Sequence, residues 1–418
     1  MRAIVIGSGL LGVSSAWFLA RAGCEVTVLE RSSGSAQGTS FANAGMLTPS
    51  MADPWNSPGI FWHLLQWLGR EDAPFLLRPR ALPSMLGWGL SFLRHSSAAH
   101  QRASMDANLR LASYSLAVLR DLRATLKLVY DERTAGTLKV FRDRRAFDAA
   151  AARNAQLAAM GLDVRAVTGA EAVAIEPALA PVADRLVGGV YCPADESGDA
   201  RSFTLALADH AREAGVKFVF NADVDGFELD GGRITAASVD GASHAAEVFV
   251  VAAGSWSALL LEGIGVALPV RPVKGYSITL PTEGWDGAPK LPVVDDGLHA
   301  AATPLGQRLR VAGTAEIAGY DTSLTPARIE NLFNLLLELF PSYAPRLDRS
   351  AAQPWAGLRP VSTDGVPRIG QLGPENLFVN TGHGHLGWTH ATGSGALLAD
   401  LVCGKAPAIG AAPYDPRR

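Results

Sequence analysis

The amino-acid sequence predicts a mixed α/β protein that begins with a dinucleotide-binding βαβ unit. Residues 2–6 are a continuous apolar run, typical of a buried parallel strand. A glycine-rich turn follows at 7–12, and residues 10–22 have the pattern of a helix. Residues 25–30 supply the second strand, which completes a unit of the Rossmann type.

The rest of the chain alternates between helical and extended patterns, and its length of 418 residues suits two or three domains. Helices are expected at 103–128, 144–160, 201–214, 326–340 and 388–402. Strands are expected at 137–141, 187–192, 216–220, 269–281, 308–316, 366–369 and 376–380. A meander is expected at 224–229, 233–239 and 245–251, because Asp-Gly turns separate its strands.

Composition excludes several classes of function. The net charge is −3 and no basic run is present, so no nucleic-acid partner is expected. Cys24, Cys192 and Cys403 are scattered, which predicts neither a disulfide framework nor a metal site and suits a reducing, cytoplasmic compartment. Residues 1–23 resemble a signal peptide in part, but strand, turn and helix explain the glycines better, so no cleaved segment is expected. No apolar run is long enough for a transmembrane helix.

The glycine-rich turn carries the most specific motif of the chain. Gly7 permits the tight turn, Gly9 lets a pyrophosphate approach the backbone, and Gly12 lets helix and strand pack closely. The helix N-terminus attracts phosphate through its free amides and its dipole. Glu30 ends the second strand and is placed to accept hydrogen bonds from ribose hydroxyls, which disfavours NADP.

The cofactor is predicted to be FAD rather than NAD. The motif stands first in the chain and is not repeated. Residues 380–388 form a second strand–turn–helix junction near the C-terminus. Its helix N-terminus would suit the N1–C2=O edge of a flavin, which becomes anionic on reduction.

Several blocks make the chain similar to a known superfamily over nearly its whole length. They are the motif at 7–9 and residues 39–45, 136–138, 195–199, 274–277, 355–360 and 381–389, of which the last two are the most specific. The chain resembles the FAD-dependent amine oxidoreductases, which include D-amino acid oxidase, glycine oxidase and sarcosine oxidase, and within them the bacterial D-amino acid dehydrogenases. The resemblance implies oxidative deamination of D-amino acids to 2-oxo acids and ammonia, with a hydride passing from Cα to flavin N5.

The resemblance also implies two discontinuous domains. An FAD-binding domain of the glutathione-reductase type is expected at 1–54, 144–255 and 350–410, and an antiparallel-sheet substrate domain at 55–143 and 256–349. Residues 411–418, rich in proline, are expected to form a loose tail. Some relatives attach FAD covalently, but the loop 39–45 has no histidine and the cysteines lie outside the flavin-facing blocks, so non-covalent FAD is expected.

The resemblance assigns further cofactor contacts. Residues 43–46 should present their backbone to the flavin pyrimidine and N5 edge, and residues 386–389 should do so at N1 and O2. The adenine should lie near Val224 and the diphosphate near Ala253 and Gly254. The full set of expected cofactor-binding residues is Gly7, Gly9, Leu10, Leu11, Gly12, Glu30, Arg31, Asn43, Ala44, Gly45, Met46, Val224, Ala253, Gly254, Gly382, His385, Leu386, Gly387, Trp388 and Thr389.

Two residues are assigned to the substrate. Arg359 is expected to bind the substrate carboxylate, because a guanidinium matches a carboxylate with two parallel hydrogen bonds; a structural salt bridge is the alternative. Tyr276 is expected to add a hydroxyl to that contact or to wall the pocket, with an ordinary strand tyrosine as the alternative. His383 and His385 are expected to shape the turn rather than act in catalysis or bind a metal.

The electron acceptor remains open at this point. A dehydrogenase would pass electrons to a quinone or another carrier. The alternatives are an oxidase that uses O₂, a relative acting on D-proline, hydroxyproline or sarcosine, and a flavin-binding subunit with a structural or regulatory role. A nicotinamide dehydrogenase is disfavoured by the single dinucleotide motif.

Residues 55–95 combine four tryptophans with several prolines and arginines. The prolines make the stretch too broken to span a bilayer. One interpretation is that its aromatic residues pack the substrate domain and roof the active site. The other is a peripheral contact with the inner face of the cytoplasmic membrane, where tryptophan and arginine suit the headgroup level and a quinone is within reach.

Overall fold

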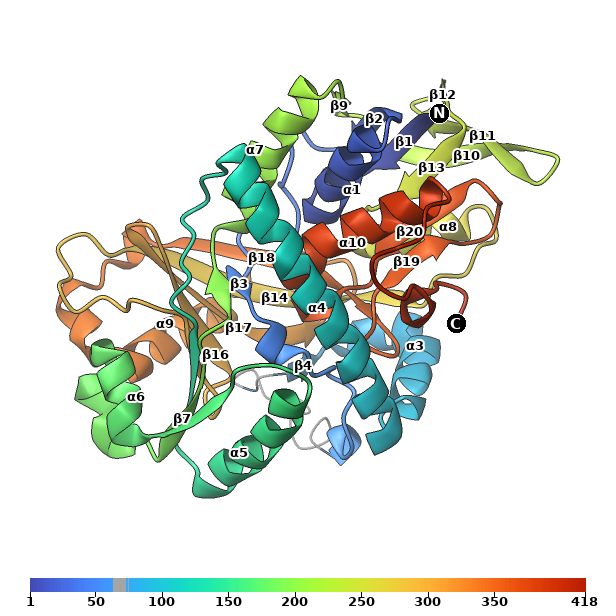
Figure 1. The fold of residues 1–418 in the computed structure, drawn as a ribbon. Coiled ribbons are helices and arrows are strands. Elements are labelled where there is room, and N and C mark those ends of the chain that lie inside the picture. The colour runs from blue at the N-terminus through green and yellow to red at the C-terminus, as the bar shows by residue number, and fades with distance from the viewer. Residues whose placement is uncertain (63–72, 74) are drawn as a thin grey trace.

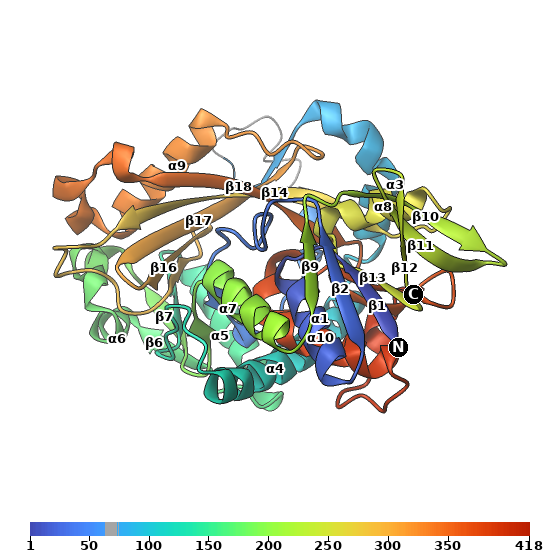
Figure 2. The same ribbon diagram turned by 90° about the horizontal axis from the view of Figure 1, so that it is seen from above.

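The computed structural model describes residues 1–62, 73 and 75–418 of the chain. Two large sheets dominate these residues (Figures 1 and 2). The first is a six-stranded sheet in the order β19 (Arg368–Gln371), β20 (Leu377–Thr381), β13 (Val248–Val251), β1 (Arg2–Ile6), β2 (Glu25–Glu30) and β9 (Lys217–Phe220). All its pairings are parallel except that of β19 with β20.

Helices and a meander cover the two faces of this sheet. The alternate residues Ala3 and Val5 of β1 face one core, and Ile4 and Ile6 face the other, as the period of a strand requires. The first core is formed with α1 (Leu10–Arg21), α4 (Ala98–Leu126), α7 (Ala200–Glu213) and α10 (Gly387–Val402). The second is formed with α8 (Ser257–Glu262) and the meander of β10 (Val224–Asp230), β11 (Arg233–Val239) and β12 (Ala242–Ala245).

Small residues bring α1 and α10 into close contact beneath the sheet. A Cβ at Gly395 would lie 2.7 Å from the backbone of Ser14, so the two helices approach at a distance that only glycine allows there. Figure 1 shows the two helices side by side, with α4 crossing below them. This packing fixes the N-termini of α1 and α10, the two helix ends to which the sequence assigns the cofactor.

The second large sheet has nine strands within the described residues, and α9 (Pro326–Leu339) packs on its face away from α1 (Figure 2). Its order is β18 (Gln353–Ser362), β14 (Val270–Pro281), β17 (Arg308–Ile317), β16 (Ala300–Leu305), β15 (Val293–Asp295), β5 (Thr137–Phe141), β7 (Gly188–Cys192) and β6 (Arg165–Thr168), and β4 (Phe75–Leu77) pairs with β17. The remaining elements are α3 (Leu82–Arg94), α5 (Arg144–Ala159), α6 (Gly169–Ile175) and the short pair β3 (Met46–Leu47) and β8 (Glu196–Ser197).

Strand pairing departs from the expected boundaries at three places. The strand expected at 245–251 is divided, since 242–245 joins the meander and 248–251 enters the parallel sheet. The strands β6 and β7 lie in the second sheet, although 144–255 was assigned to the FAD-binding domain. The same holds for β18, which pairs with β14. The division into two domains stays a prediction. Its boundaries would have to change so that β6, β7 and β18 fall in the substrate domain.

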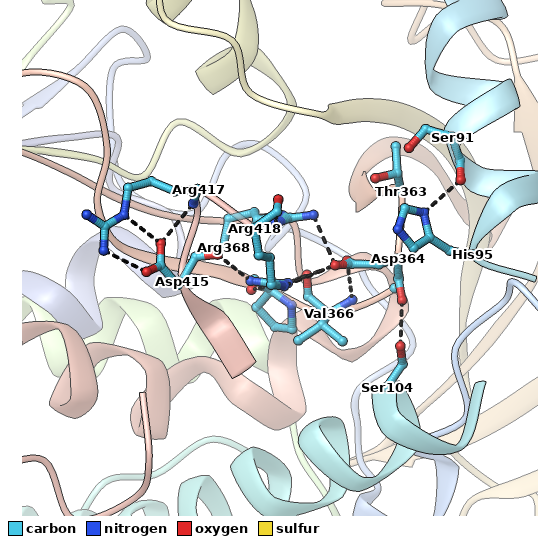
Figure 3. Close-up of polar contacts among 12 residues, drawn as sticks. Ser91, His95, Ser104, Thr363, Asp364, Val366, Arg368, Asp415, Arg417 and Arg418 are labelled. Carbon is cyan, nitrogen blue, oxygen red and sulfur yellow. Dashed lines mark hydrogen bonds and ion pairs between the residues drawn. The ribbon is translucent and has the colours of Figure 1, made fainter. Parts of the chain in front are cut away.

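The expectation of a loose tail at 411–418 is wrong. The Tyr414 ring is fully buried, and its hydroxyl donates to the carbonyl of Ala107 at 2.8 Å. The Arg418 guanidinium donates to the Asp364 carboxylate at 3.0 Å and to the carbonyl of Val366 at 2.8 Å, as Figure 3 shows. Hydrogen bonds and an ion pair therefore fix residues 411–418, although their prolines suggested a loose tail.

The stretch 55–95 is partly core and partly exposed where it is described. Trp88 packs against Met85 and Val273, and its indole Nε1 donates to the carbonyl of Val361 at 3.1 Å. Trp62 and Leu86 are instead exposed. Trp67 and the other residues of the stretch at 63–72 and 74 lie outside the described residues. Across the described part of the chain, no helix has both the length and the hydrophobicity that crossing a bilayer requires.

Candidate active site

A cavity of about 1300 Å³ lies between the two sheets and reaches from the glycine-rich turn to α3. Its walls include most of the residues that the sequence assigned to the cofactor and substrate. Those that line it are Gly7, Gly9, Leu10, Leu11, Glu30, Arg31, Asn43, Ala44, Gly45, Met46, Val224, Ala253, Gly254, Tyr276, Arg359, His385, Gly387 and Trp388. Gly12, Gly382, Leu386 and Thr389 do not line it.

The glycine-rich turn has the geometry of a phosphate cradle. Gly7 has a φ of +101°, and a Cβ there would lie 2.7 Å from the carbonyl oxygen of Ala252. Gly12 packs directly on the Gly7 carbonyl, which explains its place behind the cavity wall. At Gly9 the nearest protein atom to such a Cβ is Ser40 Oγ at 3.2 Å, so the space above Gly9 belongs to the cavity. The residues present fit a bound pyrophosphate.

The first turn of α1 offers amides to that space. Gly9 caps the helix without a side-chain hydrogen bond, and no acidic residue stands in the first turn. The Leu10 amide donates to Ser40 Oγ at 3.0 Å, whereas those of Leu11 and Gly12 meet no acceptor among the described residues. Free amides at a helix N-terminus favour an anion.

Glu30 occupies the end of β2 as the motif requires. Its Oε2 accepts hydrogen bonds from the Ser8 amide at 2.7 Å and its Oε1 from the Ser32 amide at 2.8 Å. These contacts, with a further one from Ser8 Oγ to Oε2 at 2.9 Å, fix the carboxylate at the cavity wall and leave Oε1 a lone pair for a ribose hydroxyl. Beside it, the Arg31 guanidinium lies 3.8 Å from the centre of the Trp256 ring.

The N-terminus of α10 is a second place where backbone meets the cavity. Gly387 begins the helix, and its cap, Leu386, makes no side-chain hydrogen bond. The Trp388 Nε1 donates to the carbonyl of Gly198 at 3.1 Å, and Thr389 Oγ1 accepts from the Thr48 amide at 3.1 Å. Thr389 and the buried Leu386 thus hold the turn in place from behind.

Arg359 is a partly buried cation without a carboxylate partner among the described residues. Its Nη1 donates to the carbonyl of Thr314 at 3.3 Å, and its guanidinium lies 5.7 Å from the centre of the Trp55 ring. Burial lowers the pKa of Arg359 to about 10, still well above neutrality. An uncompensated buried charge is costly, so a cation held in a cavity is suited to an anionic ligand.

Two glycines make room for this cation. Val273 and Arg359 are cross-strand partners on β14 and β18, and Gly275 and Gly357 are the next pair on the same face. The guanidinium of Arg359 lies over Gly275, and the indole of Trp355 lies over Gly357, where Cβ atoms would overlap them. A small ligand therefore meets the guanidinium and the indole, which lie on the two glycines.

Tyr276 was expected either to add a hydroxyl to the substrate carboxylate or to wall the pocket, and its position favours the second role. Tyr276 borders the cavity, but its hydroxyl donates to Glu316 Oε2 at 2.7 Å and approaches Thr325 Oγ1 at 3.0 Å. The ring belongs to the core that α9 covers. Successive strand residues face opposite sides, so the position beside Gly275 points away from Arg359.

The histidines of the 381–389 block are neutral wall residues. His385 stacks on Trp55 with ring centres 5.3 Å apart, and its Nε2 lies 3.3 Å from the Met51 carbonyl. Burial lowers the pKa of His383 well below its usual value of 6.5. Desolvation by the surrounding atoms also lowers the pKa of His385, to about 4, although that residue is exposed where it lines the cavity. Among the described residues, no group of acidic, histidine or cysteine side chains could hold a metal ion.

Several cavity residues were missed by sequence reasoning, chiefly Ser40, Gly275, Thr314, Trp355 and Gly357, whereas Trp55 belongs to the stretch 55–95 whose aromatic residues were expected on one interpretation to roof the active site. A usable signal existed for two of them. Gly275 and Gly357 stand inside the blocks 274–277 and 355–360, and a glycine in a strand often marks a close approach. Ser40 accepts a hydrogen bond from the Leu10 amide, and the Thr314 carbonyl accepts one from Arg359. Both contacts join segments that are far apart in the sequence, so local patterns do not reveal them.

Comparison with known proteins agrees with this geometry. Residues 2–401 match the family of FAD dependent oxidoreductases (DAO). The chain is 44% identical over 410 residues to a D-amino acid dehydrogenase of Paramagnetospirillum magneticum, covering 98% of this chain and 96% of the relative. A D-amino acid dehydrogenase of Bradyrhizobium diazoefficiens is 42% identical over 409 residues, with the same coverage of 98% and 96%.

Solved structures share the fold at lower identity. Glycine oxidase from Geobacillus kaustophilus superposes with a TM-score of 0.78 at 23% identity, covering 100% of this chain and 99% of that one. L-proline dehydrogenase from P. horikoshii gives a TM-score of 0.78 at 20% identity, covering 100% and 97%. The match over residues 2–401 and the near full-length relatives show that the chain belongs to the FAD-dependent oxidoreductase (DAO) family.

Proposed function

We propose that this protein oxidises D-amino acids to 2-oxo acids and ammonia with non-covalently bound FAD, and that it passes the electrons to a quinone. The observation that carries the substrate assignment is Arg359, a partly buried guanidinium that lines the cavity without a carboxylate partner among the described residues. The names of the relatives, which are 42–44% identical, support the D-amino acid as the substrate.

The chain's own groups bind and orient rather than exchange protons. Arg359 would hold the carboxylate with two parallel hydrogen bonds, as a guanidinium does best. Gly275 and Gly357 leave the space above the strands that the Arg359 guanidinium and the Trp355 indole fill, and Trp55 lines the cavity beside them. FAD, when bound, supplies the acceptor for the hydride.

Replacement of Arg359 tests the carboxylate assignment. Arg359→Ala should raise the substrate KM by about tenfold to over a hundredfold, the equivalent of about 1.5–3 kcal/mol for a lost charge-assisted contact. Arg359→Lys should recover only part of this, because the forked geometry is gone. FAD content serves as the control and should not change. Unchanged KM in the alanine variant would rule out the assignment.

The quinone and membrane assignments rest on an exposed apolar face beside the cavity. Leu82, Leu86 and Leu90 recur every four residues along α3 and are exposed, as are Phe61 and Trp62. All of these except Trp62 also line the cavity, so the cavity opens at this face. Such a face suits the acyl–headgroup boundary of a membrane, and a quinone could reach the cavity from it.

Vesicle flotation tests this part of the proposal. The wild-type protein should float with anionic vesicles, and Leu86→Glu with Leu90→Glu should abolish flotation while leaving FAD bound. Leu205→Glu on α7, another exposed leucine, is the matched control and should float normally. If the wild type stays at the bottom and short-chain quinones do not reoxidise its reduced flavin, the membrane assignment is wrong. Substrate-dependent release of peroxide would favour the oxidase alternative.

A further inference from the structure

Residues 42–45 form a loop that lines the cavity where the flavin is expected. Three carbonyls of this loop accept hydrogen bonds from residues outside it. Ser277 Oγ donates to the Ala42 carbonyl at 2.7 Å, and the Gly198 amide donates to that of Gly45 at 2.8 Å. Between them, Arg310 Nη1 donates to the Asn43 carbonyl at 3.2 Å. All three donors lie outside the loop and are not mobile surface groups, since Ser277, Gly198 and Arg310 are buried.

Because a peptide unit is planar, a hydrogen bond that fixes a carbonyl also fixes the direction of the next residue's amide. In a trans peptide the C=O and the following N–H point in opposite directions. A carbonyl of Asn43 fixed toward Arg310 therefore directs the Ala44 N–H toward the other side of the loop, where Ala44 lines the cavity. The Ala44 amide meets no acceptor among the described residues, which leaves it available to an acceptor atom of a bound flavin.

Arg310 is itself fixed by two further contacts. Its Nε donates to Thr279 Oγ1 at 3.0 Å, and its Nη2 donates to Asp199 Oδ2 at 3.2 Å. The arginine is 3% exposed, and burial lowers its pKa, which the neighbouring Asp199 opposes. Asp199 is held in turn, because its Oδ1 accepts from the Ser202 amide at 3.0 Å and caps α7. Hydrogen bonds to Asn43, Thr279 and Asp199 thus fix the orientation of the guanidinium.

We infer that Arg310 is a positioning residue for the flavin: with Asp199 and Thr279 it holds the Asn43 carbonyl away from the ring and aims the Ala44 amide at it. A carbonyl oxygen turned toward the flavin would repel the negative charge that the ring gains on reduction, whereas an amide stabilises it. Arg310 therefore favours the reduced flavin without touching the substrate. The inference concerns the cofactor, and it can be tested in the absence of any amino acid.

Sulfite provides that test, because it adds through its sulfur lone pair to flavin N5 and leaves negative charge on the ring. Holoenzyme carrying Arg310→Met should bind sulfite at least tenfold more weakly than the wild type, the effect of losing one oriented charge-assisted contact. Its flavin reduction potential should be lower. Arg308→Met is the matched control. Arg308 lies on the same strand and contacts Asp199 at 3.4 Å, but it makes no described contact with the loop, so sulfite binding should not change.

A milder variant covers the case in which Arg310→Met fails to fold or to keep FAD. Thr279→Val removes one anchor of Arg310 and keeps its charge, and it should weaken sulfite binding severalfold in the same direction. Full FAD content with unchanged sulfite affinity and potential in either Arg310→Met or Thr279→Val would overturn the inference. An equal effect of Arg308→Met would overturn it too, since it would mean that net charge rather than the orientation of the loop sets the flavin's properties.

Discussion

The guanidinium of Arg359 lies over Gly275, two residue pairs along the β14–β18 ladder from its own cross-strand partner, Val273. The glycine is what allows the guanidinium to lie against the strand where it lines the cavity. The same face holds Gly357 beneath Trp355, so the absence of two side chains shapes the site as much as the side chains that are present.

Gly275→Ala should therefore damage substrate binding without affecting the cofactor. The added methyl group would displace the guanidinium, and the KM for the amino acid should rise about tenfold or more, as for a lost charge-assisted hydrogen bond. Gly226→Ala, at a strand glycine with no neighbour within 4 Å of its Cβ, is the control and should be kinetically silent. A wild-type KM in Gly275→Ala would show that Arg359 need not lie where the structure has it.

Gly9 and Gly12 should respond differently to the same substitution. Gly9→Ala places a methyl group in the cavity, so the protein should fold but lose most of its FAD. Gly12→Ala would collide with the Gly7 backbone and should lower the thermal stability of the protein itself. Acid extraction should release FAD rather than FMN from the wild type, and circular dichroism separates folding from occupancy. Full FAD content in Gly9→Ala would contradict the assigned role.

Asp195 predicts a pH dependence of stability. Its carboxylate accepts from Ser50 Oγ and from Thr137 Oγ1 at 2.6 Å, and burial raises its pKa from 3.8 to about 6. The unfolded chain releases this proton first as pH rises, so folding stability should fall between about pH 4 and pH 6. The loss should be on the order of 3 kcal/mol.

Asp195→Asn should remove this slope, because the amide does not titrate. Denaturant unfolding of both proteins at pH 4, 5, 6 and 7 measures the difference, which should grow in favour of the variant up to about pH 6. Parallel pH profiles for the two proteins would show that Asp195 does not titrate in that range.

Arg418 should contribute measurably to stability although it lies near the end of the chain. Beyond its contacts to Asp364 and Val366, its carbonyl accepts from Arg368 Nη1 at 2.8 Å (Figure 3). Arg418→Ala should lower the free energy of unfolding by about 1–3 kcal/mol, since it removes several hydrogen bonds to a largely buried carboxylate. Arg417→Ala, whose contacts are to the more exposed Asp415, should cost less. Equal stability of both variants and the wild type would restore the interpretation of a loose tail.

Patterns that depend on near neighbours were readable from the sequence. The βαβ unit, α7, β14, β17 and α10 lie within a residue or two of their expected bounds, because strand and helix periods and glycine turns are local signals. The glycine-rich turn and Glu30 fall where their motif places them. The family assignment and FAD dependence are likewise confirmed.

The sequence could not show which distant segments contact each other or which side of a strand faces the cavity. Tyr276 and Gly275 are adjacent, and only the register between β14 and β18 decides which of them faces Arg359. The anchoring of residues 411–418 depends on Asp364 and Ala107, far away in sequence. The approach of Cys24 and Cys403 to 3.9 Å between their sulfurs is equally invisible in a scattered cysteine pattern.

Anaerobic mixing shows whether the cavity presents an amino acid to FAD for oxidation. Purified holoenzyme would be mixed without oxygen with D-amino acids, their L-enantiomers, D-proline, hydroxyproline and sarcosine, while the visible absorbance of the oxidised flavin is recorded. D-amino acids should bleach the flavin, the 2-oxo acid and ammonia should form stoichiometrically, and bleaching should be strongly slowed in Arg359→Ala. A flavin that no amino or imino acid bleaches, or that L-amino acids bleach in preference, would contradict the proposed function.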